Sequence, residues 1–289
     1  MTVNFPQLRA FLAVVDAGGF SAAAVELGLS QSAVSRAVAS LEREFAAPLL
    51  VRSGPVRTTA LGERVLPYAR DALSAVRGVE AVAADAAGSG TGTVRLAATP
   101  TVRRGLVPDL VRRWAEREPG ISVRVFEGGS DEITGWLENG TADAAVLIDP
   151  PPGPGVQLAV DGYRVLLRRD HPLADEPVVD VRELEDDDFL TSPGGCEDRV
   201  RRLHDLAGLR FAPEHRVRDL ATLIGMVQAG LGVTVLSEVS RPLVPPDLVL
   251  LPVAPRISRR LVLSGPRDGA WHPAVRALAR SSAVAAQER

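Results

Sequence analysis

Residues 20–58 pair two short helical patterns across a glycine turn, and this arrangement constrains the chain more than any other stretch does. Ala23 and Leu27 share one face of the first pattern. Gly28 then supplies the tight corner that two helices at a steep angle need, and Ser30 is placed to cap the second helix. The sequence therefore predicts a helix-turn-helix near the start of the chain.

The second of these helices combines a buried stripe with a slender exposed face. Apolar residues recur at i, i+4 and i+7 in Val34, Val38 and Leu41. The other faces are small, polar and nearly free of acid, with Gln31, Ser32, Ser35, Arg36 and Ala39. A helix that enters the major groove of DNA needs slim residues with a few donors for base edges and phosphates. The pattern indicates a DNA-reading helix; the alternative is a helical hairpin inside an unrelated core.

A short hairpin is expected directly after this helix. Strands are predicted at 49–51 and 56–58, with a turn at 52–55 between them, which extends the motif to a winged helix-turn-helix. Arg52 and Arg57 would lie on this wing. Because no acidic residue occurs between Phe45 and Gly62, we expect both guanidinium groups to be free to meet phosphate or the minor groove. The alternative is that both are solvated surface charges.

Two more helices complete the first part of the chain. An amphipathic helix with Leu8, Phe11, Leu12 and Val15 precedes the motif and closes at Gly18. Residues 60–87 form one long helical pattern, whose apolar seam we expect to pair with the same helix of a second subunit. Packing of this seam against its own chain is the alternative. The seam consists of Leu61, Val65, Tyr68, Ala72, Val76, Val79 and Ala83. Residues 88–92 then form a linker by composition.

Beyond the linker, strands and helices alternate. Strands are predicted at 94–98, 121–126 and 144–148, with helices at 103–118 and 130–139. After the proline-rich segment 149–155, we expect strands at 164–168, 215–218 and 233–236 and helices near 197–207 and 220–229. Strands at 248–253 and 260–264 and a helix at 272–286 are expected to return to the first lobe. Two α/β lobes joined by crossing strands predict a ligand-binding cleft at the carboxyl ends of the strands.

Composition and residue types set the outer limits. The 289 residues carry a formal net charge of −3, which argues against nonspecific coating of nucleic acid. The one cysteine, Cys196, and four dispersed histidines predict no disulfide, no metal site and no cofactor. Cys196 is placed to open a helix, where a thiolate would be favoured, but a passive cysteine is the better interpretation. We expect no catalytic activity, no membrane span and a cytoplasmic location.

Over essentially its full length the chain resembles the LysR-type transcriptional regulators. The specific matches are the segments at 11–24 and 29–42, and the weaker ones are 127–128, 140–143, 171–174 and 227–233. The resemblance implies an α/β protein with a winged helix-turn-helix domain at 1–59, a dimerising linker helix at 60–87, a hinge at 88–92 and a two-lobed, periplasmic-binding-protein-like effector domain at 93–289. Lobe I would comprise about 93–155 and 248–289, and lobe II about 156–247. Leu50 stands where the family commonly has Phe, and Ser237 where it commonly has Pro.

The resemblance also implies partners and site residues. The partners would be double-stranded operator DNA, a small-molecule effector and further copies of the chain in a homodimer or homotetramer. Gln31, Ser32, Ser35 and Arg36 would read the major groove, and Arg52 and Arg57 would make the wing contacts.

Thr99, Pro100 and Thr101 match the place where the family meets its effector. A helix expected to begin near Val102 would point its positive end at an anionic group, with a carboxylate as the natural occupant. The competing hypothesis is a cytoplasmic small-ligand-binding protein without specific DNA binding.

Overall fold

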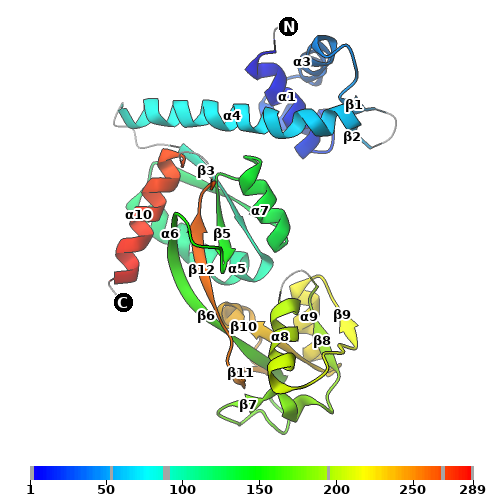
Figure 1. Cartoon of the computed structure of the whole chain (residues 1–289), viewed down its shortest axis with the longest axis vertical. Helices are drawn as coiled ribbons and strands as arrows, with labels where there is room; N and C mark the ends of the chain where they lie inside the picture. Colours follow the sequence, from blue (N-terminus) through cyan, green and yellow to red (C-terminus); the bar gives the residue numbers. More distant parts are fainter. Residues whose placement is uncertain (1–2, 53–54, 87–91, 194–195, 268–270, 288–289) are drawn as a thin grey trace. The chain divides into compact units, whose positions relative to one another are not determined.

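The structure is a computed structural model that describes residues 3–52, 55–86, 92–193, 196–267 and 271–287. It separates into two compact units (Figure 1). The N-terminal unit holds residues 1–88 with 138–141, and the C-terminal unit holds 89–137 and 142–289. The tip of the expected wing turn at 53–54 and most of the expected linker, 87–91, lie outside the described residues.

The N-terminal unit is a helical domain with a small hairpin. Its elements are α1 (Phe5–Asp16), α2 (Phe20–Leu27), α3 (Gln31–Glu44), β1 (Leu50–Val51), β2 (Arg57–Thr58) and α4 (Ala60–Ala86). Asn4 starts α1 with a reciprocal capping box: its side chain accepts from the backbone N–H of Gln7, and the Gln7 side chain accepts from that of Asn4. The expected stripe on α3 is confirmed, because Val34, Val38 and Leu41 are each 0% exposed.

The apolar residues of helix α4 fall into two groups, one in contact with the core and one exposed. Ala69 and Leu73 are buried in the core of the N-terminal unit, and Leu61, Val65 and Ala72 pack against that core. The prediction of a single seam for a partner is therefore wrong for Leu61, Val65 and Ala72. Among the described side chains of α4, the large apolar ones that are exposed are Tyr68, Val79 and Val82, at 76%, 70% and 56% exposure.

Lobe I of the C-terminal unit is built on strands in the order β4-β3-β5-β12-β6. Strands β3 (Gly92–Ala98), β4 (Ile121–Glu127) and β5 (Ala144–Ile148) are parallel, and β12 (Ser258–Ser264) is antiparallel to β5 and to β6 (Gly155–Arg168). The helices of this lobe are α5 (Pro100–Gly105), α6 (Val107–Arg117), α7 (Ser130–Glu138) and α10 (Pro273–Gln287).

The helix predicted at 103–118 is in fact two helices, α5 and α6. Pro108 has no N–H to donate and would clash with the carbonyl one turn before it, so it is tolerated only in the first turn of a helix. The chain accordingly breaks at Leu106 and starts α6 one residue before Pro108. The first helix begins earlier than expected, at Pro100, with Thr99 as its N-cap.

Lobe II continues the same strand β6 into a second sheet. It comprises β7 (Val179–Asp180), β8 (Phe189–Thr191), β9 (His215–Arg216), β10 (Val233–Ser237), β11 (Leu248–Ala254), the helices α8 (Glu197–Ala207) and α9 (Leu220–Gln228), and the 3-10 turns η1 (Val181–Leu184) and η2 (Glu238–Leu243). Strand β11 pairs with β6 and β7 and so belongs to lobe II, which corrects the predicted return of 248–253 to lobe I. Strand β6 is also far longer than predicted, because it serves both sheets.

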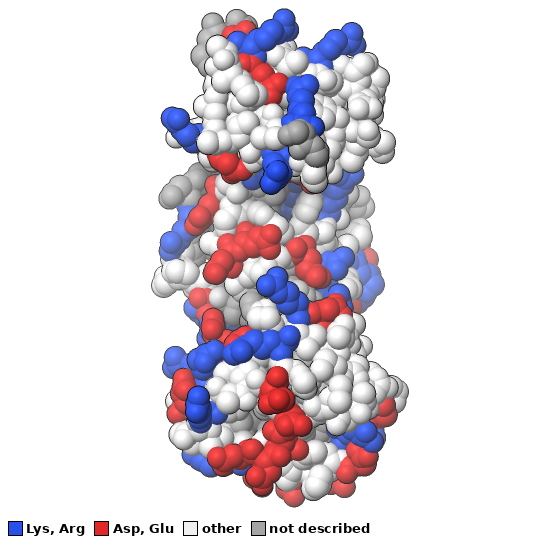
Figure 2. All heavy atoms as spheres, turned by 90° about the vertical axis from the view of Figure 1, so that its right-hand side faces the viewer, with Lys and Arg blue, Asp and Glu red and all other residues white. Residues whose placement is uncertain are grey.

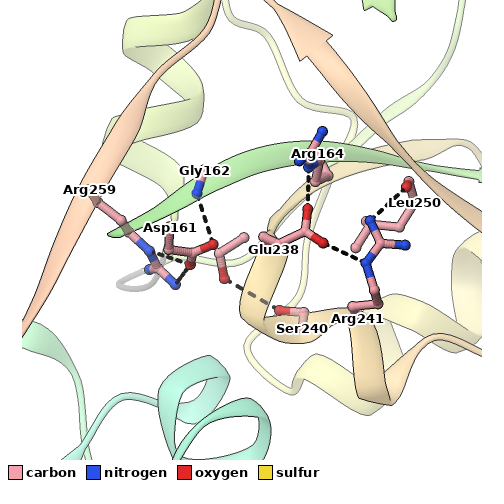
Figure 3. Close-up of polar contacts among 9 residues, drawn as sticks. Asp161, Gly162, Arg164, Glu238, Ser240, Arg241, Leu250 and Arg259 are labelled. Carbon is pink, nitrogen blue, oxygen red and sulfur yellow. Dashed lines mark hydrogen bonds and ion pairs between the residues drawn. The ribbon is translucent and has the colours of Figure 1, made fainter. Parts of the chain in front are cut away.

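Strands β6 and β12 cross between the lobes, and a buried ion pair joins them (Figure 3). Arg259 on β12 donates from Nε and Nη2 to Asp161 on β6 at 2.9 and 2.7 Å. Asp161 Oδ1 accepts from the backbone N–H of Gly162, so both carboxylate oxygens are satisfied. The same view shows Glu238 of η2 between Arg164 and Arg241, which ties η2 to β6.

Candidate functional site

Helix α3 is the second helix of the helix-turn-helix motif, and its first turns present polar residues to solvent. Gly28 adopts a left-handed conformation with φ of 65°, the corner that the sequence predicts. Ser30 caps α3 by accepting from the backbone N–H of Ala33 at 3.2 Å. Four residues that the sequence assigns to the major groove thereby share the first two turns: Gln31, Ser32 and Arg36 are exposed, and Ser35 is half-buried.

The two wing arginines differ. Arg52 pairs with Glu42 at 2.7 Å, and its guanidinium lies 5.2 Å from the ring centroid of Phe20. The other oxygen of Glu42 accepts from the backbone N–H groups of Leu49 and Leu50. The expectation that both guanidinium groups are free is therefore wrong for Arg52, because an acid from α3 reaches the wing in space although none is near in sequence. Arg57 is exposed on β2.

A cavity opens in the C-terminal unit where the first strand of lobe I ends. The three residues expected at the effector site, Thr99, Pro100 and Thr101, all line it. Thr99 is 3% exposed. Its hydroxyl makes no capping bond to α5 and has no hydrogen-bond partner among the described residues. A buried donor without a partner costs about 1–3 kcal/mol, so this hydroxyl is available to a ligand.

Lobe II supplies the other polar wall of the cavity, through Ser192, Cys196 and Arg218. Ser192 Oγ contacts the Arg218 carbonyl oxygen at 3.5 Å, which connects two lining segments that lie 26 positions apart. Sequence reasoning did not assign these three residues to the cavity, because no local motif marks them. The only available signal was that Cys196 was expected to open a helix, and it is the N-cap of α8.

The remaining lining is aliphatic. It consists of Ile148, Leu220, Leu223, Val235 and Leu236, besides Pro100. Neither an acidic nor an aromatic side chain is among the eleven described residues that surround the cavity. The arrangement therefore offers an apolar body site beside a small group of donors.

The surroundings of the Cys196 thiol disfavour its thiolate form. Its side chain is buried, and burial raises its pKa, although nearby Arg259 opposes that shift. The thiolate is the nucleophilic form, so a raised pKa disfavours reaction at neutral pH. This supports the interpretation of Cys196 as a passive cysteine. No group of three metal-ligating side chains occurs within the described ranges.

Ion pairs connect the two lobes close to the cavity. Arg104 of α5 lies 3.7 Å from Asp219, which caps α9, and Arg199 of α8 lies 2.9 Å from Asp149, which follows β5. Arg103 pairs with Glu127 at 2.9 Å. Arg103 and Arg104, which are neighbours on α5, therefore each have an acidic partner.

A helix-turn-helix unit followed by a two-lobed α/β unit with a cavity at its strand ends is the architecture of a ligand-responsive DNA-binding regulator. The chain belongs to the LysR family of bacterial transcriptional regulators: residues 5–63 match the family model "Bacterial regulatory helix-turn-helix protein, lysR family", and residues 87–284 match the LysR substrate binding domain. The chain is accordingly a DNA-binding transcriptional regulator with an effector-binding domain. This sets aside the competing hypothesis of a ligand-binding protein without specific DNA binding.

Relatives and solved structures agree with this assignment. An uncharacterized HTH-type transcriptional regulator of Bacillus subtilis, YvbU, is 29% identical over 92% of both chains. A probable hydrogen peroxide-inducible genes activator of Mycobacterium avium is 33% identical over 81% of this chain and 78% of its own length. A full-length OxyR variant from Pseudomonas aeruginosa has the same fold, with a TM-score of 0.74 and 24% identity over 98% of this chain and 95% of that one. Within the described part of the chain, none of the helices combines the length and hydropathy that a membrane span requires.

Proposed function

We propose that α3 reads operator DNA through Gln31, Ser32, Ser35 and Arg36. The observation that carries this proposal is the division of α3 into a fully buried apolar stripe and a slim polar face that holds one cation and no acid in its first two turns. Arg57 and Arg52 extend the contact from the wing. Arg57 is the stronger wing contact, because Arg52 must exchange its pairing with Glu42 for a phosphate. On the face shown in Figure 2, acidic and basic groups are interspersed.

The exposed face of α4 is the dimerisation surface in this proposal. Tyr68, Val79 and Val82 lie at i, i+11 and i+14 on one helix and are all more than half exposed. Burying them against the same helix of a second copy places two reading heads on one operator, as a two-fold dimer requires. A tetramer forms when two such dimers associate. The protein acts in the cytoplasm, where chromosomal DNA is found.

The cavity is the effector site in this proposal, and its occupant carries an anionic group. The supporting observation is the buried Thr99 hydroxyl, which has no partner among the described residues. Helix α5 has only six residues, so its dipole adds little to the attraction. Binding in the cavity bridges the lobes, since residues of both lobes line it.

A gel-shift assay against the DNA that flanks the protein's own coding region tests the proposal. We expect saturable, sequence-dependent binding that falls steeply with salt. Binding that a scrambled duplex of equal length competes for equally well would contradict the assignment of α3. A thermal-shift screen of small carboxylates, repeated on Thr99→Val, tests the effector site in parallel.

Hydrogen peroxide is a second candidate signal, because a relative is named a probable hydrogen peroxide-inducible genes activator and Cys196 lines the cavity. The raised pKa of the Cys196 thiol opposes it, and a chain with a single cysteine forms no intramolecular disulfide. We therefore favour reversible ligand binding. Operator affinity should be the same before and after peroxide treatment, and the same for Cys196→Ser. A peroxide-dependent change that Cys196→Ser abolishes would reverse this preference.

A further inference from the structure

Arg218 is the one cationic residue among the described residues that line the cavity. It lies between β9 and α9, is exposed and lines the cavity. Among the described residues no acidic side chain forms an ion pair with it. The acid next to it in sequence, Asp219, accepts from the backbone N–H and the hydroxyl of Thr222 at the start of α9 and pairs with Arg104.

The hydrogen-bond donors that line the cavity match a ligand with one negative charge. Among the described lining residues, Thr99, Thr101 and Ser192 carry hydroxyl groups and Arg218 carries the one guanidinium group. A carboxylate that accepts from arginine and hydroxyl donors makes charge-assisted hydrogen bonds, which are stronger than neutral ones. A second carboxylate, or a phosphate dianion, would lack a second cation here.

The lining excludes an ammonium group on the same ligand. A bound amine needs an acidic partner once it leaves water, and none of the eleven described lining residues is Asp or Glu. The body of the ligand meets Ile148, Leu220, Leu223, Val235 and Leu236, which are all aliphatic. Compact apolar bodies without charge therefore fit this wall.

From these observations we infer that the effector is a compact aliphatic monocarboxylate without an amino group, and that Arg218 is the residue that selects for its charge. The inference rests on the proposed effector site and narrows its ligand class. Arg218 binds the carboxylate at the mouth, the Thr99 hydroxyl donates to it from the buried end, and the aliphatic wall of lobe II covers the body.

Isothermal titration of the full-length protein tests this with propionate, isobutyrate and isovalerate as probes. Isovaleramide, leucine and 3-methylglutarate are the matched compounds that remove the charge, add an amine or add a second carboxylate. We expect a monocarboxylate to bind, and each matched compound to bind roughly tenfold or more weakly than isovalerate. Arg218→Gln should weaken isovalerate by roughly tenfold and abolish the preference for acid over amide.

Two control variants separate this role from a general loss of positive charge. Arg216→Gln removes a cation two positions away that pairs with Glu197 and does not line the cavity, and it should bind like the parent protein. Arg218→Lys should retain the preference for acid over amide. Any one of four results would overturn the inference. These are equal binding of acid and amide by the parent protein, undiminished binding of isovalerate to Arg218→Gln, stronger binding of leucine or 3-methylglutarate than of isovalerate, and no binding of any monocarboxylate. If leucine or 3-methylglutarate binds instead and shifts operator affinity in the gel-shift assay, the proposed function stands without this ligand class.

Discussion

At the scale of single residues, Arg36 and Arg52 carry the same charge but differ in their surroundings. Arg36 is exposed on α3 beside the polar face, whereas Arg52 is engaged by Glu42 and lies against the Phe20 ring. A contact between Arg36 and a base edge would add to affinity without first breaking an intramolecular pair. The sequence predicts that both arginines contact DNA, but only their surroundings in the structure indicate which of them adds more to the affinity.

Arg36→Ala should leave the fold intact and weaken specific operator binding by about 1–3 kcal/mol, because it removes one base-edge contact. Gel shifts at fixed salt measure the loss. Arg9→Ala, which removes an exposed arginine from α1, is the control for net charge. If both variants lose affinity equally on specific and scrambled DNA, Arg36 contacts phosphate and reads no base.

His204 is a buried histidine that should make folding sensitive to acid. It is 7% exposed, packs against Phe189 and Phe211, and its Nδ1 contacts the Val200 carbonyl oxygen at 2.8 Å. Burial lowers its pKa from the ordinary value of 6.5. The unfolded chain therefore binds a proton at a higher pH than the folded one does, and stability falls as pH drops below about 6.5 toward the lower folded pKa.

His204→Phe should flatten this loss of stability on the acid side of pH 6.5, although it also removes the bond to Val200. Urea denaturation between neutral and mildly acidic pH measures the slope. His215→Gln, at an exposed position, serves as the comparison. If stability falls with pH as steeply in His204→Phe as in the parent protein, other groups cause the acid sensitivity.

At the scale of elements, α4 shows how one helix serves two surfaces. Its first half packs on α1 and the helix-turn-helix core, and its exposed apolar residues continue to Val82 near its end. The periodicity of the sequence gives the spacing of apolar residues but not which neighbour covers each one. The half-buried Val76 is for this reason a less specific probe of dimerisation than the 70% exposed Val79.

Val79→Asp should weaken dimerisation by about tenfold or more, because it brings two like charges to a dyad-related apolar surface. Sedimentation velocity measures the dimer, and operator affinity should fall with it. Glu80→Ala, at the neighbouring exposed position, should leave the dimer unchanged. An undisturbed dimer in Val79→Asp would move the interface away from this face of α4.

Two glycines should respond in opposite ways to the same change. A Cβ at Gly105, the last residue of α5, would lie 1.7 Å from the Val239 carbonyl oxygen of η2, so Gly105→Ala should destabilise the protein by about 1–3 kcal/mol. A Cβ at Gly135 within α7 meets no atom within 4 Å, so Gly135→Ala should stabilise it by about 0.5–1 kcal/mol. Chemical denaturation measures both. Similar effects of the two variants would contradict the close contact of α5 with η2.

At the scale of the whole molecule, an effector in the cavity must bind the DNA-bound and free arrangements with different affinity if it is to regulate. Linkage then requires operator DNA to change effector affinity by the same factor. The cavity joins both lobes, and ion pairs cross between the lobes beside it. A ligand that changes the fit of the two lobes therefore acts on strands β6 and β12, which cross between them.

Thr99→Val should have opposite effects on stability and on ligand binding. It replaces a buried hydroxyl without a partner by a methyl group, so the ligand-free protein should gain about 1 kcal/mol. Isovalerate should bind roughly threefold to tenfold more weakly, since one donor is lost. Operator affinity without ligand should not change. Thermal shift, titration and gel shift separate the three quantities, and unchanged isovalerate affinity would place the ligand elsewhere.

Features that depend on local spacing and capping could be predicted from the sequence alone. The α3 stripe, the Ser30 cap, the Gly28 corner and most strands of the C-terminal unit follow from periods and turn residues that act over a few positions. Three features depend on the tertiary structure: the pairing of Arg52 with Glu42, the place of β11 in lobe II, and the presence of both Thr99 and Arg218 in the lining of one cavity. These depend on contacts between segments far apart in the chain, and a pattern along one segment does not specify the partner that packing brings to it.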